Sequence, residues 1–232
     1  MQKLKNELDR LYLANAQEGC TRAIHLGFPK LADDGETAHW DRLCVVANAL
    51  QERLGLAAPA VSIDGVKGYG LWLSLQEATP VAQAQRFAEL LCAAYCPEMT
   101  PAPDAASATA HLPPQKKSDS GKWSAFIHPG MGAAFAEEPG LDIQPPEAGQ
   151  LGFLEGLASI DAPQFAQALA QLAPALAPQP AAQPAAHLAA LGAAGAAPLP
   201  DQLLLKDATL EDIVKYLHSK NIEPTFRHLL PK

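Results

Sequence analysis

The sequence predicts an α+β domain, in which an antiparallel sheet is connected through helices. Residues 21–28, 60–63 and 69–75 have the apolar alternation or the short apolar runs of strands. Residues 37–54 and 79–95 have apolar side chains at the three- and four-residue spacing of helices. The order β-α-β-β-α needs one more strand to complete the split β-α-β arrangement of ferredoxin-like and RNA-recognition-like folds, with the helices on one face of the sheet.

The first predicted strand has two different sides. Ile24, Leu26 and Phe28 lie on one side, and His25 and Gly27 lie on the other. We expect the apolar side to pack against the helices. His25 is then expected on the open face of the sheet, where a ligand could lie, and it is a candidate ligand-binding residue.

The helix that follows carries Trp40, Leu43 and Leu50 on one side, and Gly55 is suited to end it. Pro97 ends the second helix.

The two strands after the first helix are joined by a turn that begins Asp64-Gly65, which is typical of a hairpin. In the second of them Tyr69, Leu71 and Leu73 share one side, whereas Trp72 lies on the other. The all-apolar side is expected to face the helices, so Trp72 should lie beside His25 on the open face.

The remaining strand of the sheet is predicted at 108–112 or at 122–128. Two further helices are predicted at 149–159 and 164–172, and a short turn or helix at 130–138.

The chain divides into four parts by composition. Residues 1–20 form an N-terminal helical segment and residues 21–172 the α+β domain. Residues 173–200 hold only Ala, Pro and other uncharged residues, which predicts a linker, and residues 201–232 form a C-terminal helical tail.

Charge and cysteine content limit the classes of function. The formal net charge is −8, and residues 201–232 carry five acids and five bases, so the excess acid lies upstream. This balance disfavours non-specific coating of nucleic acid. The four cysteines lack C-x-x-C pairs, so we expect reduced thiols and no metal or cofactor. The N-terminus lacks the apolar run of a signal peptide and no stretch could span a bilayer, so a cytoplasmic protein is expected.

The segment Lys67-Gly-Tyr-Gly-Leu-Trp72 resembles the start of the ribonucleoprotein signature of RNA-recognition domains. That signature needs Tyr69 and an aromatic residue 71 on the open face. Here residue 71 is Leu and the strand alternation places both residues against the helices. Base stacking by this motif is therefore not expected.

Residues 60–75, followed by Glu77-Ala-Thr-Pro-Val-Ala-Gln-Ala84, are similar to the central block of archaeo-eukaryotic-type primase-polymerases. Trp72 matches the Trp of that block, and Gly70 stands where the family has a nucleotide-contacting His. The resemblance implies a pair of magnesium-binding carboxylates on the preceding strand, but His25 and Gly27 occupy its open face. The catalytic carboxylates are missing, so the resemblance implies a scaffold without catalysis.

The block Gly121–Pro146, with Gln150 and Leu154, resembles an uncharacterised proteobacterial protein family. This resemblance implies bacterial origin and transfers no mechanism. Within the block, His128 is a second candidate ligand-binding residue. His128, Glu137, Glu138 and Asp142 could form a polar or metal-binding cluster, although the surrounding prolines favour ordered turns.

The tail predicts one amphipathic helix at 210–220. Thr209 suits its N-terminus, and an apolar stripe of candidate partner-binding residues runs along it, namely Leu210, Ile213, Val214 and Leu217. So short a helix needs its stripe buried, either on the parent domain or in the groove of a protein partner. The first alternative is favoured because a tethered segment has a high effective concentration; deletion of residues 201–232 should then lower the melting temperature.

Two hypotheses of function follow. The leading one is a non-catalytic, primase-like accessory or interaction module that contacts nucleic acid or a nucleotide through Gly70, Trp72 and His25. The alternative is a protein-interaction adaptor that binds no nucleic acid. A third, an enzyme of unknown class that uses His25 or His128, has little support, because the sequence lacks G-x-x-x-x-G-K-S/T, G-x-S-x-G and H-E-x-x-H motifs.

Overall fold

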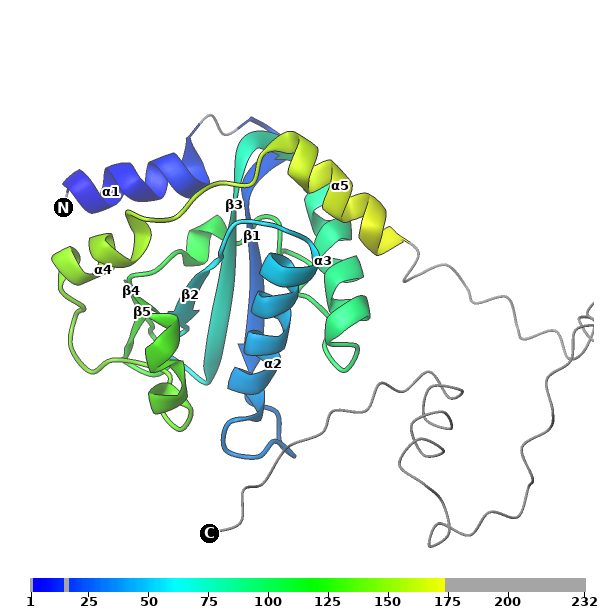
Figure 1. The fold of residues 1–232 in the computed structure, drawn as a ribbon. Helices are drawn as coiled ribbons and strands as arrows, with labels where there is room; N and C mark the ends of the chain where they lie inside the picture. Colours follow the sequence, from blue (N-terminus) through cyan, green and yellow to red (C-terminus); the bar gives the residue numbers. More distant parts are fainter. Residues whose placement is uncertain (1, 15–16, 174–232) are drawn as a thin grey trace, which may run out of the picture. The chain divides into compact units, whose positions relative to one another are not determined.

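A computed structural model describes residues 2–14 and 17–173 (Figure 1). The predicted tail, with Leu210, Ile213, Val214 and Leu217, and nearly all of the predicted linker lie outside the described residues. In chain order the elements are α1 (Gln2–Leu8), η1 (Asp9–Leu13), β1 (Cys20–Pro29), α2 (Ala38–Asn48), η2 (Ala49–Arg53), β2 (Ala60–Ile63), β3 (Gly68–Pro80), α3 (Val81–Tyr95), η3 (Ala108–His111), β4 (Gln115–Lys116), β5 (Trp123–Ile127), η4 (Pro129–Phe135), α4 (Glu147–Leu154) and α5 (Ala162–Leu172).

The α+β class is confirmed. The five strands form one sheet in the order β1-β3-β2-β5-β4, and every neighbouring pair is antiparallel. β1 and β2 therefore run in the same direction on either side of β3, with α2 between them in the chain, as a split β-α-β unit requires.

The last long strand is not where a ferredoxin-like sheet would have it. Of the two predicted positions, residues 123–127 form β5, whereas residues 108–111 form a 3-10 helix. β5 pairs with β2, not with β1. The edge of β1 is occupied instead by the connection after α3, because the backbone N–H of His25 donates to the Ala105 carbonyl at 2.8 Å.

The first face of the sheet packs against α2, α3 and α5, which lie together on one side in Figure 1. The predicted register of β3 is confirmed, because Tyr69, Leu71 and Leu73 belong to this core and are buried. Phe87 of α3 and Phe165 of α5 pack against each other in this core, with ring centroids 5.0 Å apart.

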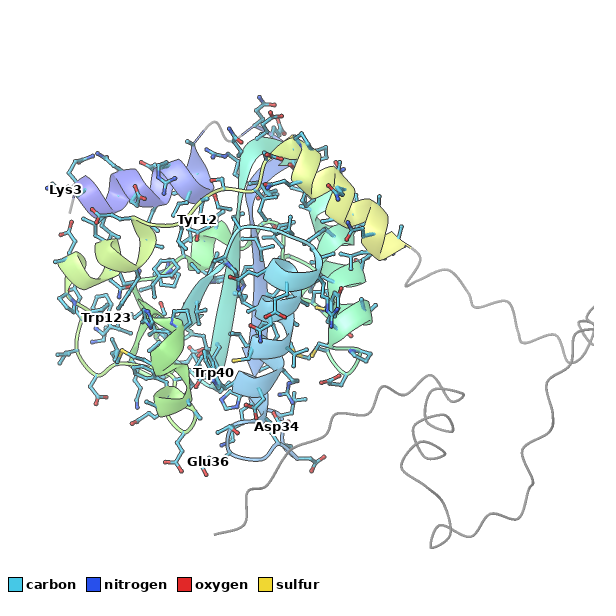
Figure 2. All side chains as sticks on the ribbon, in the orientation of Figure 1. Lys3, Tyr12, Asp34, Glu36, Trp40 and Trp123 are labelled. Carbon is cyan, nitrogen blue, oxygen red and sulfur yellow. The ribbon has the colours of Figure 1, made fainter. Side chains whose placement is uncertain are left out.

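The second face of the sheet is also covered, so the prediction of helices on one face only is wrong. Leu4 of α1, Leu11 and Tyr12 of η1 and Leu154 of α4 form a second core with Trp72. Figure 1 shows α1 and α4 on this side of the sheet, and Tyr12 is labelled in Figure 2. A large aromatic side chain needs apolar cover, and the N-terminal segment supplies it. Trp72 is only 2% exposed.

Within the described residues, no helix is long and apolar enough to cross a membrane.

Candidate functional site

The second face brings together three of the four candidate ligand-binding residues, namely His25, Gly70 and Trp72. His25 of β1 pairs directly with Trp72 of β3, and their rings lie 4.2 Å apart between centroids, tilted by 31°. Gly70 lies beside them, opposite Gly27. The shared face of His25 and Trp72 is as predicted, but it is not an open face.

Gly70 is a position where a side chain has no room. A Cβ built on it would lie 2.6 Å from His25 Nε2 and 2.7 Å from Ser62 Oγ. The imidazole of His25 and the hydroxyl of Ser62 thus fill the space above the Gly70 backbone. A histidine at this position would displace both groups.

Trp72 is fixed by its surroundings. Its indole Nε1–H donates to Ser62 Oγ at 2.9 Å, so its polar atom is satisfied inside the protein. Tyr12 meets its ring edge-on at 6.0 Å and Phe126 of β5 at 6.5 Å. A side chain held in this way cannot stack on a base without unfolding of its cover.

The electrostatic surroundings of His25 keep it neutral. The pKa of its imidazole is lowered to about 4, chiefly by burial; His111 and Lys117 also lower it, whereas Asp104 raises it. At neutral pH this residue has a ring nitrogen able to accept a hydrogen bond and another able to donate one. It can therefore bind a polar group, but it carries no charge with which to attract an anion.

Within residues 2–14 and 17–173, no group of three His, Cys, Asp or Glu side chains could hold a metal ion. The four cysteines are free thiols, and burial raises the pKa of Cys92 to about 11 and of Cys96 to about 12. Of the acids after His128, Glu138 forms an ion pair with Lys122, and Asp142 lies 3.9 Å from the same ammonium group.

His128 lies apart from the other candidates. It is exposed, and its Nδ1 accepts from the backbone N–H of Gly130 at 3.0 Å, which caps η4. An Nδ1 that accepts leaves the proton of a neutral ring on Nε2, where it is free to donate.

A groove of about 180 Å³ adjoins His128 at the start of β2 and the end of β5. Its lining has no charged residue, and Phe153 of α4 stands at its border with 36% of its surface exposed. The lining residues are Ala58, Pro59, Ala60, Val61, Phe126, Ile127, His128, Pro129, Gly152, Phe153 and Leu157. We call this the apolar groove.

Sequence reasoning missed a second buried histidine. His39 of α2 is fully buried, and its ring lies 5.0 Å from that of Tyr69. Tyr69 donates its hydroxyl to the Gly132 carbonyl at 2.7 Å, and Trp40 packs on Gly132 so closely that a Cβ there would lie 2.0 Å from the indole. Helical spacing predicted that Trp40 lies on the apolar side of α2, but it could not predict the contact with Gly132 in η4.

Two residues after the block 121–146, Gln150 and Leu154, have a structural role. The Gln150 side chain donates to the Phe126 carbonyl at 2.9 Å and accepts from the Phe126 N–H at 2.8 Å, so it replaces a neighbouring strand. Leu154 is fully buried in the second core.

Comparison of the chain with family models, with curated proteins and with solved structures found no match.

Proposed function

We propose that the protein is a non-catalytic interaction module on a primase-like scaffold, and that its partner is another protein. The non-catalytic part is supported by the residues of the second face. His25 and Gly27 stand where a primase-polymerase would need carboxylates, and magnesium prefers oxygen ligands.

The choice of a protein partner is supported by one observation above all, the apolar groove. Its lining is uncharged, and Phe153 exposes apolar surface there that water solvates poorly. An aliphatic or aromatic side chain of a partner fits this chemistry, and His128 Nε2–H could donate to a carbonyl of the partner's backbone. The burial of Trp72 argues in the same direction, because it removes the aromatic surface that bases would need.

A photo-crosslinking amino acid tests this proposal. Placed at Phe153 in the full chain and expressed in the native host, it should capture one discrete protein. Val66 is also exposed but lies outside the groove, so the same substitution there is the matched control. Capture at Phe153 that is lost on Leu157→Arg supports the proposal; equal capture at both positions, or none at Phe153, contradicts it.

The second candidate is the nucleic-acid module, and the observation in its favour is the pair of basic groups, His111 and Lys117, beside His25. Fluorescence anisotropy with labelled single-stranded DNA and RNA over a salt series separates the two candidates. Salt-sensitive binding that is weakened by Lys117→Ala would favour the nucleic-acid module. No binding at low salt favours the adaptor.

Catalysis is tested by primer synthesis and extension with magnesium or manganese. We expect no nucleotide incorporation. Incorporation that disappears on Trp72→Ala, in protein shown to remain folded, would overturn the non-catalytic proposal.

A further inference from the structure

A second groove, of about 340 Å³, lies between α2 and the C-terminal end of α3. Its α2 wall consists of residues three or four positions apart, which share one face of the helix. The lining residues are Ala38, Asp41, Arg42 and Val45 from α2, with Tyr95, Cys96 and Glu98 from the end of α3 and the loop after it. We call this the acidic groove.

The one basic residue of the acidic groove is already neutralised. Arg42 donates to Asp34, in the loop before α2 (Figure 2), at 2.7 Å and to the Pro29 carbonyl at 3.2 Å. The hydrogen bonds from Arg42 hold the pKa of Asp34 well below its usual range, so the pair remains ionised. The charge of the acidic groove is therefore set by its two other acids, Asp41 and Glu98.

One further feature makes the acidic groove negative. α3 ends beside it, and its last turn contains no basic residue, so the negative end of the helix dipole is not compensated from within the helix. Cys96 contributes no positive or negative charge, because burial and Glu98 raise the pKa of its thiol to about 12.

The acidic groove also offers apolar contact. Val45 is 52% exposed, and Tyr95 is half-buried at the end of α3. A tyrosine ring can stabilise a cation placed over its face. The long apolar stem of a lysine or arginine could cover Val45 while its charged head lies near the carboxylates.

We propose that the acidic groove binds a Lys or Arg side chain of a protein partner, together with an aliphatic residue next to it in the partner's sequence. The charge complementarity of Asp41, Glu98 and the end of α3 carries this inference. It rests on the proposed function in one respect, that the partner is a protein; it concerns a different surface from the apolar groove.

Selection from a random dodecapeptide display library on the full-length protein tests the inference. The enriched peptides should share a Lys or Arg beside Leu, Ile or Val. The dissociation constant of the best peptide, measured by calorimetry, should rise about tenfold or more in the double variant Asp41→Asn, Glu98→Gln, the loss of about one charge-assisted contact. It should also rise with salt.

The matched control removes two exposed acids outside the groove, Glu52→Gln with Glu89→Gln, and should change the dissociation constant less than about twofold, because such charges are screened. Peptides that bind without a basic residue, or that bind the groove variant and the control equally, overturn the acidic groove and leave the proposed function standing. No enriched peptide at all, together with no crosslinked protein at Phe153, overturns both.

Discussion

The two faces of the sheet are covered in different ways. The first face is a large, mainly aliphatic core that packs against α2, α3 and α5. The second core is smaller, a larger share of its side chains is aromatic, and its cover comes from elements far apart in the sequence, α1 with η1 and α4. The second face contains His25, Ser62 and Ser74, whose hydroxyl donates to the Leu11 carbonyl at 2.6 Å.

This difference shows that polar side chains on a sheet face do not by themselves indicate an open binding surface. The hydroxyl of Ser62 accepts a hydrogen bond from Trp72, and the hydroxyl of Ser74 donates one to the N-terminal segment. Of the two candidate residues with rings on this face, Trp72 has a hydrogen-bond partner among the described residues and His25 has none. The surfaces that we propose for partners lie elsewhere, in the apolar and acidic grooves.

The largest expected effect tests whether the second face is a true core. Trp72→Ala should lower the free energy of unfolding by about 3–5 kcal/mol, because it leaves a cavity between Tyr12 and Phe126. Leu71→Ala, on the first face of the same strand, should lower it by about 2–5 kcal/mol. Urea unfolding measures both.

Trp72→Phe is the matched control, since it keeps an aromatic ring and removes the hydrogen bond to Ser62. It should lower the free energy of unfolding by about 1–3 kcal/mol. A loss below about 1 kcal/mol for Trp72→Ala would mean that the cover of the second face contributes little to stability.

The next effect concerns pH and belongs to the second face. The pKa of His25 is about 4 in the folded protein, against an ordinary 6.5, so the unfolded chain takes up the proton first as the pH falls. The free energy of unfolding is therefore unaffected by the titration of His25 above pH 7. As the pH falls from 6.5 to 4, protonation of this residue in the unfolded chain lowers the free energy of unfolding by about 3 kcal/mol in all.

His25→Gln should remove this part of the pH dependence, measured as urea unfolding at several pH values. The pKa of His39 is also lowered by burial, so a slope of the same sign remains in the variant. Identical slopes for the variant and the unaltered protein would contradict the burial of His25.

A third effect concerns the contact between η4 and α2. Gly132→Ala should lower the free energy of unfolding by about 1–3 kcal/mol, since its Cβ would overlap the indole of Trp40. Gly152→Ala, in α4, meets open space and should be stabilising by about 0.4–1 kcal/mol. Thermal unfolding distinguishes the two, and equal effects would exclude the contact of Gly132 with Trp40.

The smallest effect concerns the start of α5, on the first face. Asp161 Oδ1 accepts from the Gln164 N–H at 2.7 Å, and the Gln164 side chain accepts from the Asp161 N–H at 3.2 Å. Asp161→Ala should lower the free energy of unfolding by about 1 kcal/mol, whereas Asp161→Asn should retain most of the cap. Equal losses in denaturant unfolding would argue against a capping role.

Much of the sheet and of the helices on its first face could be predicted from local sequence. The alternation of Ile24, Leu26 and Phe28 gives the orientation of β1, and the predicted strand at 60–63 coincides with β2. The predicted and observed boundaries differ mainly at the end of β3. The strand predicted at 69–75 continues to Pro80, and the helix predicted from residue 79 starts only at Val81. Pro80 has no N–H to donate to the sheet or to the helix, so the strand can end and the helix can begin at this residue.

The candidate site was predicted less completely. The shared face of His25 and Trp72 followed from the period of two, but Ser62 as partner of Trp72 did not, because the pairing of β2 with β3 sets that contact. The tail prediction, with its docking stripe, concerns residues outside the described part of the chain and stays a prediction.

The sequence by itself predicted the first three strands and the helices between them, and which side of the first and third strands faces the helices, because backbone periodicity and side-chain polarity are local properties. Only the tertiary structure decided that β5 joins the sheet at β2, and that α1, η1 and α4 close the second face over Trp72. These choices depend on which distant apolar surfaces fit together and on which edge of the sheet is still unpaired. Burial of that kind is a property of the whole packed chain, and no window of sequence contains it.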